Sequence, residues 1–283
     1  MTIDAADLID LARYPIDDPD GPGYQALLQH CHDELQDDGC CVLPGFVHSE
    51  ALAALVAECD QVSSAAHRSF NRTNAYFTLD DEKLPADHPR RRFYDRSNAF
   101  VPADNFGPES PLRAIYEWPA FMPFIQAALG EVSFHRYADP LADVIVNQTE
   151  AGGGFPWHFD TNSFTVTLAI QNGDAGGAFE YCPNLRCPDD ENYSGVAAVL
   201  EGDRAPIRTL ALGPGDLQIF KGRYTLHRVT PVEGDRLRYV GIFSFVEEPN
   251  MVGRVERTRQ LYGRVLPIHL EREALVRADA LAD

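Results

Sequence analysis

The chain has 283 residues, of which 45% are hydrophobic, and its formal net charge is −19. This composition is sufficient for a substantial folded core, while the excess of acidic residues disfavours nucleic acid or an anionic membrane as a partner. No apolar run is long enough to predict a membrane-spanning helix, and the acidic N-terminus lacks the basic-then-apolar order of a signal peptide. The six cysteines form no Cys-x-x-Cys pair, so we expect free thiols and a cytoplasmic location.

The first part of the chain, residues 1–130, is predicted to be mainly helical. Apolar residues recur at helical spacing in three stretches, and a strand and turn are expected between the first two, over 39–46. Residues 70–110 contain four prolines and many charges, and we predict an irregular segment there. The predicted helices span 22–38, 49–67 and 111–129.

Residues 131–250 have the pattern of a β-rich core. From Val132 to Phe245, short stretches of β-branched and aromatic residues alternate with Gly and Pro turns, which is typical of an antiparallel barrel or jelly roll. Residues 251–283 return to a helical pattern, broken at Pro267. We therefore expect one domain over 1–283, with the β core carrying the site.

Three residues of this core form a metal-ligand pattern. His158 and Asp160 are two positions apart, and residues i and i+2 of an extended segment point to the same face. His227 lies in a second strand-like stretch. Two imidazoles and one carboxylate are the set that holds Fe(II) on one face and leaves positions open for oxygen chemistry.

Two arginines follow the distal histidine. Arg236 lies nine residues after His227, and the run from Arg236 to Phe245 is predicted to be a strand in which Arg236 and Arg238 share one face. A guanidinium binds a carboxylate through two parallel hydrogen bonds. The pattern thus indicates that a carboxylate-bearing ligand is held beside the metal.

Over roughly residues 135–250, these motifs resemble those of the Fe(II)/2-oxoglutarate-dependent oxygenases. Trp157 and the stretches 176–181, 183–186 and 220–223 are similar to a bacterial branch of free-amino-acid hydroxylases and radical halogenases. The resemblance implies a mainly β fold, a double-stranded β-helix (jelly roll) core with flanking N- and C-terminal α-helices. It also implies that Fe(II), 2-oxoglutarate as cosubstrate, and O2 oxidise an unactivated C–H bond.

The resemblance also implies roles for individual residues. His158, Asp160 and His227 would be the metal ligands and the catalytic centre, and Arg236 would bind the far carboxylate of 2-oxoglutarate. Trp157 fits the cosubstrate pocket or the core equally well, and Asn147 fits either the cosubstrate or a buried backbone group. Arg186 and Arg223 are interpretable as surface charges. Further residues expected at the site are Arg238 beside the cosubstrate and Arg96, Ser244 and Thr161 beside the substrate.

The expected reaction is a hydroxylation. Halogenases of the resembling branch have a small residue in place of the metal-binding carboxylate, because chloride needs that position, whereas this chain has Asp160. The expected substrate is a free amino acid or close derivative with an aliphatic or weakly polar side chain. Its carboxylate would bind Arg96, and its amine would bind an acid within 139–143 or just before Arg96.

Several alternatives stay open. The same cofactor chemistry would serve desaturation, ring closure, or oxidation of a carrier-bound or protein-bound residue. A cupin-type metal protein without oxygenase activity is the more distant alternative. The sequence leaves the carbon attacked and the oligomeric state undetermined.

Overall fold

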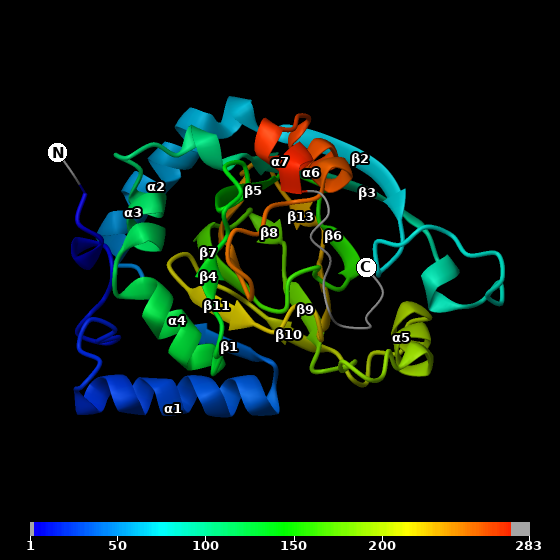
Figure 1. Ribbon diagram of the computed structural model, residues 1–283, viewed down its shortest axis with the longest axis horizontal. Helices are drawn as coiled ribbons and strands as arrows, with labels where there is room; N and C mark the ends of the chain where they lie inside the picture. Colours follow the sequence, from blue (N-terminus) through cyan, green and yellow to red (C-terminus); the bar gives the residue numbers. More distant parts are fainter. Residues whose placement is uncertain (1–2, 273–283) are drawn as a thin grey trace.

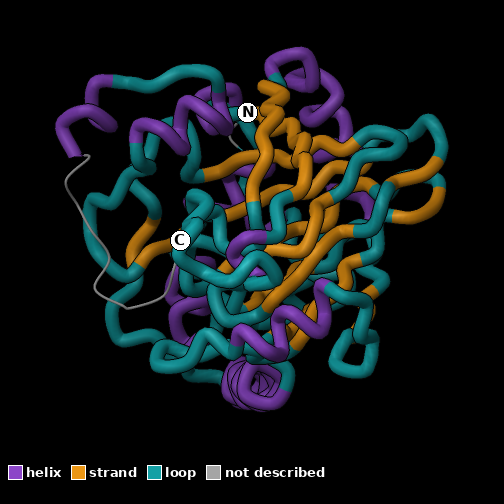
Figure 2. The backbone as a smooth tube through the Cα atoms, turned by 90° about the vertical axis from the view of Figure 1, so that its right-hand side faces the viewer, coloured by secondary structure: helices purple, strands orange, loops and turns teal. Residues whose placement is uncertain are grey.

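The computed structural model of the protein describes residues 3–272, and most of its strands form two antiparallel sheets (Figures 1 and 2). The larger sheet has seven strands, in the order β1 (Cys40–Leu43), β11 (Leu217–Phe220), β7 (Thr165–Gln171), β14 (Arg238–Phe243), β5 (Val144–Thr149), β3 (Tyr94–Val101) and β2 (His67–Thr73). The smaller has four, in the order β10 (Arg208–Leu210), β9 (Phe179–Cys182), β12 (Leu226–Val229) and β6 (Phe155–His158). Two short pairs complete the strands, β13 (Val232–Glu233) with β8 (Ala175–Gly176) and β15 (Phe245–Val246) with β4 (His135–Arg136).

Side-chain alternation gives the larger sheet two different faces. On β7, Val166, Leu168 and Ile170 belong to the main hydrophobic core, whereas Thr167 and Ala169 line a cavity on the other face. A period of two along a strand produces this division. The cavity face is therefore more polar than the core face, and it looks toward the smaller sheet.

Four helices cover the core face of the larger sheet, and Figure 1 shows them to the left of the strands and below them. They are α1 (Pro22–Asp37), α2 (Ser49–Val62), α3 (Pro111–Glu117) and α4 (Phe121–Leu129). Three more helices are α5 (Tyr193–Leu200), α6 (Val255–Tyr262) and α7 (Pro267–Arg272), and short 3-10 turns occur at Ala5–Asp7, Ser63–Ala65, Pro89–Arg91 and Ala103–Asn105. No helix within residues 3–272 has the length and apolar character needed to cross a membrane.

The predicted jelly-roll core with flanking helices is confirmed, but several boundaries differ. The helix expected over 49–67 ends at Val62, and β2 already begins at His67. The helix expected over 111–129 is two helices, because Trp118 precedes Pro119 and is extended, with ψ of 131°. Helix α5 was not predicted. The helical prediction for 251–283 includes α6 and α7, and its last part lies outside the described residues.

The prediction of an irregular segment over 70–110 is wrong in part. Strands β2 and β3 form an antiparallel pair that extends the larger sheet, so the irregular parts are the connection between them and the residues after β3. Arg96 and Asn98 on β3 are both buried. Strand β3 lacks the usual alternation of apolar buried and polar exposed residues, because its polar residues face a polar part of the interior instead of solvent.

Candidate metal centre

Three predicted ligands meet at one edge of the smaller sheet. His158 ends β6 and lies directly opposite His227 of β12 in the strand register. Asp160 follows β6, and its backbone N–H donates to the carbonyl of Gly222 at 3.1 Å. One ligand atom from each of the three lies within 4.8 Å of the others. Asp160 Oδ1 is 3.5 Å from His227 Nε2 and 3.7 Å from His158 Nε2.

Backbone carbonyls fix which nitrogen of each imidazole faces the centre. His158 Nδ1 is 2.7 Å from the Pro156 carbonyl oxygen, and His227 Nδ1 is 2.8 Å from that of Thr225. A carbonyl only accepts, so each Nδ1 carries the proton and donates it. The lone pair of each Nε2 is then directed toward the centre, as a metal ligand requires.

The electrostatics favour neutral imidazole and ionised carboxylate. Burial, together with His227 and Arg96, lowers the pKa of His158 well below its ordinary value. Burial alone would raise the pKa of Asp160, but His227, His158 and a hydrogen bond from Thr165 at 2.5 Å hold it below the ordinary value. Metal ligands must be deprotonated, and this donor set meets that condition for a divalent ion.

Gly222 leaves the space that the carboxylate of Asp160 occupies. A Cβ atom at this position would lie 2.1 Å from Asp160 Oδ2. Any larger residue would therefore push the carboxylate away from the two histidines. The glycine is needed here for close approach and not for an unusual backbone angle.

A cavity of about 240 Å³ opens from the three ligands and lies between the two sheets. Arg238 lines it, at the start of β14 and opposite Thr149 of β5. Its guanidinium is buried, and within residues 3–272 its Nε has no hydrogen-bond partner. Burial lowers the pKa of Arg238 to about 10. A buried cation without a partner is an open position for an anionic group.

The expectation that Arg236 lies beside the metal is wrong. Its side chain is 54% exposed and contacts Asp174, with Nε at 3.5 Å from Oδ1. Its backbone N–H also donates to Asp174 Oδ2, and its Nη2 donates to the carbonyl of Gly173. Strand β14 begins only at Arg238, so Arg236 belongs to the turn and does not share the cavity face.

The two other residues expected beside the cosubstrate have different surroundings. Trp157 precedes His158 on β6 but, unlike Phe155 and His158, does not line the cavity; it packs outside, beneath the guanidinium of Arg228. The pocket-lining interpretation of Trp157 is therefore wrong, and the core interpretation holds. Asn147 lines the cavity, but its amide donates to the Ala99 carbonyl and accepts from Thr149.

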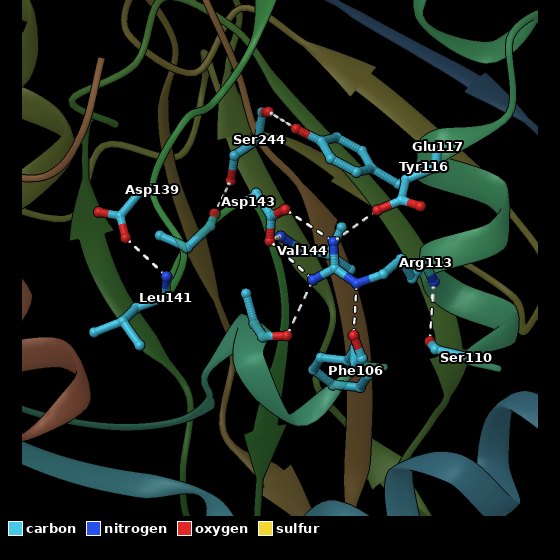
Figure 3. Close-up of polar contacts among 12 residues, drawn as sticks. Phe106, Ser110, Arg113, Tyr116, Glu117, Asp139, Leu141, Asp143, Val144 and Ser244 are labelled. Carbon is cyan, nitrogen blue, oxygen red and sulfur yellow. Dashed lines mark hydrogen bonds and ion pairs between the residues drawn. The ribbon is translucent and has the colours of Figure 1, made fainter. Parts of the chain in front are cut away.

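Of the residues expected beside the substrate, Arg96 and Thr161 line the cavity. The carbonyl of Thr161 accepts a hydrogen bond from Arg223. Ser244 also borders the cavity, but its hydroxyl donates to the Ala142 carbonyl at 2.7 Å. Figure 3 shows that hydroxyl turned to the backbone, with the Ser244 carbonyl accepting from Tyr116. Ser244 is thus part of the cavity wall, with its hydroxyl already engaged.

Of the acids proposed for a substrate amine, Asp95 just before Arg96 is exposed, and those within 139–143 are engaged. Asp139 is fully buried and accepts from the backbone of Leu141 and Gly253, while its Oδ2 is 3.0 Å from His269 Nε2. Asp143 forms a two-pronged ion pair with Arg113 (Figure 3). The two acids of the segment 139–143 therefore stabilise the fold, and neither is a free acceptor for a substrate amine.

Two buried arginines behind the metal ligands had no clear signal in the sequence. Arg186 and Arg223 are 2% and 0% exposed, so the interpretation as surface charges is wrong. The guanidinium of Arg186 lies 3.9 Å from the ring centre of Phe159, and its Nε donates to the Arg223 carbonyl. Because Arg223 in turn donates to Thr161, the two arginines hold the segment that carries Asp160. Their only signal was their place in the stretches 183–186 and 220–223.

The jelly-roll fold and its His–Asp–His face define a member of the Fe(II)/2-oxoglutarate oxygenase superfamily. Within it, residues 24–262 match the family described as Halogenase D, and the chain belongs to that family. None of the curated proteins matches the sequence significantly.

Solved structures share the fold at low sequence identity. One is the epimerase SnoN from nogalamycin biosynthesis in complex with Fe3+ and alpha ketoglutarate, with TM-score 0.53 and 16% identity, covering 79% of this chain and 84% of that one. AviO1 from Streptomyces viridochromogenes has TM-score 0.52 and 15% identity, covering 81% and 97%. A 2OG-Fe(II) oxygenase family protein from Burkholderia pseudomallei has TM-score 0.51 and 13% identity, covering 78% and 91%.

Proposed function

We propose that the protein is an Fe(II)- and 2-oxoglutarate-dependent dioxygenase that hydroxylates a small, amino-acid-like molecule. The observation that carries the proposal is the intact carboxylate of Asp160 between His158 and His227. The same cavity contains Arg238, whose Nε has no hydrogen-bond partner among residues 3–272. When bound, Fe(II) and 2-oxoglutarate supply the oxygen activation that breaks an unactivated C–H bond.

The protein's own residues supply ligands, orientation and a dry site. His158, Asp160 and His227 fit Fe(II), because they offer two neutral nitrogens and one carboxylate on one side and leave the cavity side open. Arg238 is our candidate for the far carboxylate of 2-oxoglutarate, in place of Arg236. Aromatic rings surround the two histidines and exclude water from them: Phe77, Phe155, Phe179 and Phe220.

Hydroxylation, and not halogen transfer, is the outcome that Asp160 favours, even though the family carries a halogenase name. Chloride needs a metal position that no protein ligand fills. Here Asp160 is held in that position by the hydroxyl of Thr165, by the backbone of Gly222 and by the space that Gly222 leaves. Desaturation or ring closure would need the same residues and a different placement of the target carbon.

Product analysis tests the proposal. The protein would be incubated with Fe(II), 2-oxoglutarate, O2 and a panel of free amino acids in chloride buffer, and succinate and products would be followed by mass spectrometry. We expect succinate formation that depends on one class of amino acid and a product heavier by one oxygen atom. A chlorinated product would overturn the reaction type, and turnover of carrier-bound or peptide substrates alone would overturn the substrate class.

A further inference from the structure

Two guanidinium groups share one aromatic ring in the cavity. Arg96 of β3 and Arg257 of α6 both line the cavity, and the central carbon of each lies 4.6 Å from the ring centre of Phe77. Within the part of the chain that the structure describes, no carboxylate lies in ion-pair contact with either arginine. The sequence indicated Arg96 alone, since nothing in α6 suggests that Arg257 faces the site.

The hydrogen-bonding capacity of this pair is only partly used. Arg257 Nη1 donates to Gln260 at 3.0 Å, and Asn98 can turn its amide oxygen to accept from Nε and Nη2 of Arg96. Arg96 Nη1 is buried and has no partner within residues 3–272. Burial and the nearby charge of Arg257 lower the pKa of Arg96 to about 9. Two like charges enclosed in this way are destabilising unless an anion binds between or beside them.

The backbone around Phe77 is strained in a way that keeps the ring between the arginines. Phe77 has φ of 58°, a left-handed conformation that bulky residues rarely adopt. The buried side chain of Asn74 holds the turn, accepting from the N–H groups of Tyr76 and Thr78 and donating to the carbonyl of Arg90. Strain that the surrounding structure maintains is characteristic of binding sites.

The charges of the loaded site leave this pair only partly compensated. This step rests on the proposed function. The two positive charges of Fe(II) and one of Arg238 are balanced by Asp160 and the two carboxylates of 2-oxoglutarate. Asp139 lines the same cavity and adds one negative charge; it accepts from two backbone N–H groups and lies 3.0 Å from His269 Nε2. The charges of Arg96 and Arg257 therefore exceed the remaining negative charge by one, and a zwitterion with a neutral side chain would not supply the missing negative charge.

We infer that the substrate is anionic overall and presents negative charge to both Arg96 and Arg257. The chemistry required is a pair of carboxylates or a phosphate monoester, the latter supplying two charges from one group. This inference replaces the aliphatic or weakly polar side chain expected from the sequence.

Calorimetric titration of the loaded protein tests the inference. The protein would hold Fe(II) and saturating 2-oxoglutarate without oxygen, so that Arg238 is occupied and the loaded state is verified by its visible absorption. Matched pairs of probes would then be titrated: L-glutamate against L-glutamine, and O-phospho-L-serine against L-serine. We expect the anionic member of at least one pair to bind at least tenfold more tightly than its neutral partner, and the pair that shows this separates carboxylate from phosphate.

Variants assign the effect to Arg257. Arg257→Gln should weaken binding of the preferred anionic probe about 10- to 100-fold, whereas Arg257→Lys should retain part of the affinity. Arg259→Gln, on the exposed side of the same helix, is the matched control and should leave binding unchanged. Equal binding of neutral and anionic probes, absence of binding by both anionic probes, or equal effects at 257 and 259 would overturn the inference. Failure of the loaded state to form would instead count against the proposed function.

Discussion

Two sets of cavity residues, which we call the metal side and the arginine side, differ in how their polar groups are satisfied. On the metal side, each imidazole Nδ1 donates to a backbone carbonyl, and Asp160 accepts from Thr165. On the arginine side, formed by Arg96, Arg238 and Arg257, no guanidinium has a carboxylate in ion-pair contact within residues 3–272, and Arg96 and Arg238 each leave a buried nitrogen without a partner. The polar groups of the metal side are therefore oriented before any ligand binds. The guanidinium groups of the arginine side, in contrast, need anions from bound ligands as partners. Variants on the two sides should therefore fail in different ways.

The largest effect is expected on the metal side. His227→Ala removes one of three ligands and leaves a site too poor in donors to retain Fe(II). We expect loss of stoichiometric iron, measured by elemental analysis after gel filtration, and loss of turnover. His30→Ala, on the exposed face of α1, is the control and should keep one iron per chain. Near-normal iron in His227→Ala would refute the metal assignment.

The next effect belongs to the arginine side. Arg238→Ala should raise the 2-oxoglutarate requirement about 30- to 4000-fold, since loss of one partner of a buried charged pair costs roughly 2–5 kcal/mol. Iron stoichiometry should not change, and that separation distinguishes the two sides. Arg236→Ala provides the matched control, because its side chain lies at the surface with Asp174. If the 236 variant showed the larger increase in 2-oxoglutarate KM, our placement of the cosubstrate would be wrong.

A smaller effect should follow when the metal side is disturbed without removing a ligand. Gly222→Ala places a methyl group where Asp160 Oδ2 lies, so the carboxylate must turn away. We expect iron affinity to fall about 10- to 100-fold, as for other changes that misorient a ligand. Gly107→Ala is the control, because a Cβ there meets nothing within 4 Å. Chelator competition would measure both, and equal affinities would show that Gly222 is not needed for the carboxylate.

The sequence predicted the metal side better than the arginine side for a physical reason. The two histidines lie on strands and Asp160 follows one of them directly, and strand alternation is local, so His158 and Asp160 were expected on one face from their spacing alone. Which of the two arginines, Arg236 or Arg238, lines the cavity depends on where β14 begins. That boundary depends in turn on the contacts of the preceding turn with Asp174. Arg257 reaches the cavity from a helix far along the chain, and no local pattern encodes that contact.

The same limit explains why the hairpin of β2 and β3 and the burial of Arg186 and Arg223 were not predicted from the sequence. Strand propensity and hydrophobic periodicity detect residues that face an apolar core. They miss polar residues that are buried against a cavity or behind a ligand, such as Arg96 and Arg223. The core of the fold was therefore predictable, whereas the polar lining of the site needed the three-dimensional structure.

The smallest expected effect is on thermal stability, and it is zero or stabilising. It distinguishes an arginine without an anionic partner, Arg96, from an arginine in a complete ion pair. Arg96→Met keeps an apolar chain against Phe77 and Phe155 but removes a buried charge whose Nη1 has no partner. Replacing such a charge by an apolar side chain is often neutral or stabilising. We therefore expect the melting temperature of the ligand-free protein to stay the same or to rise by a few degrees, corresponding to ~1 kcal/mol.

Arg113→Met is the matched comparison, since that guanidinium donates to Asp143, Glu117 and two backbone carbonyls (Figure 3). Its removal leaves the carboxylate of Asp143, only 20% exposed, without its cation, so we expect a loss of ~2 kcal/mol or more. Thermal unfolding of both variants, without iron or 2-oxoglutarate, gives the answer. A clear loss of stability in Arg96→Met would mean that Arg96 is a structural residue like Arg113, and the distinction between a completed and an open side of the cavity would fail.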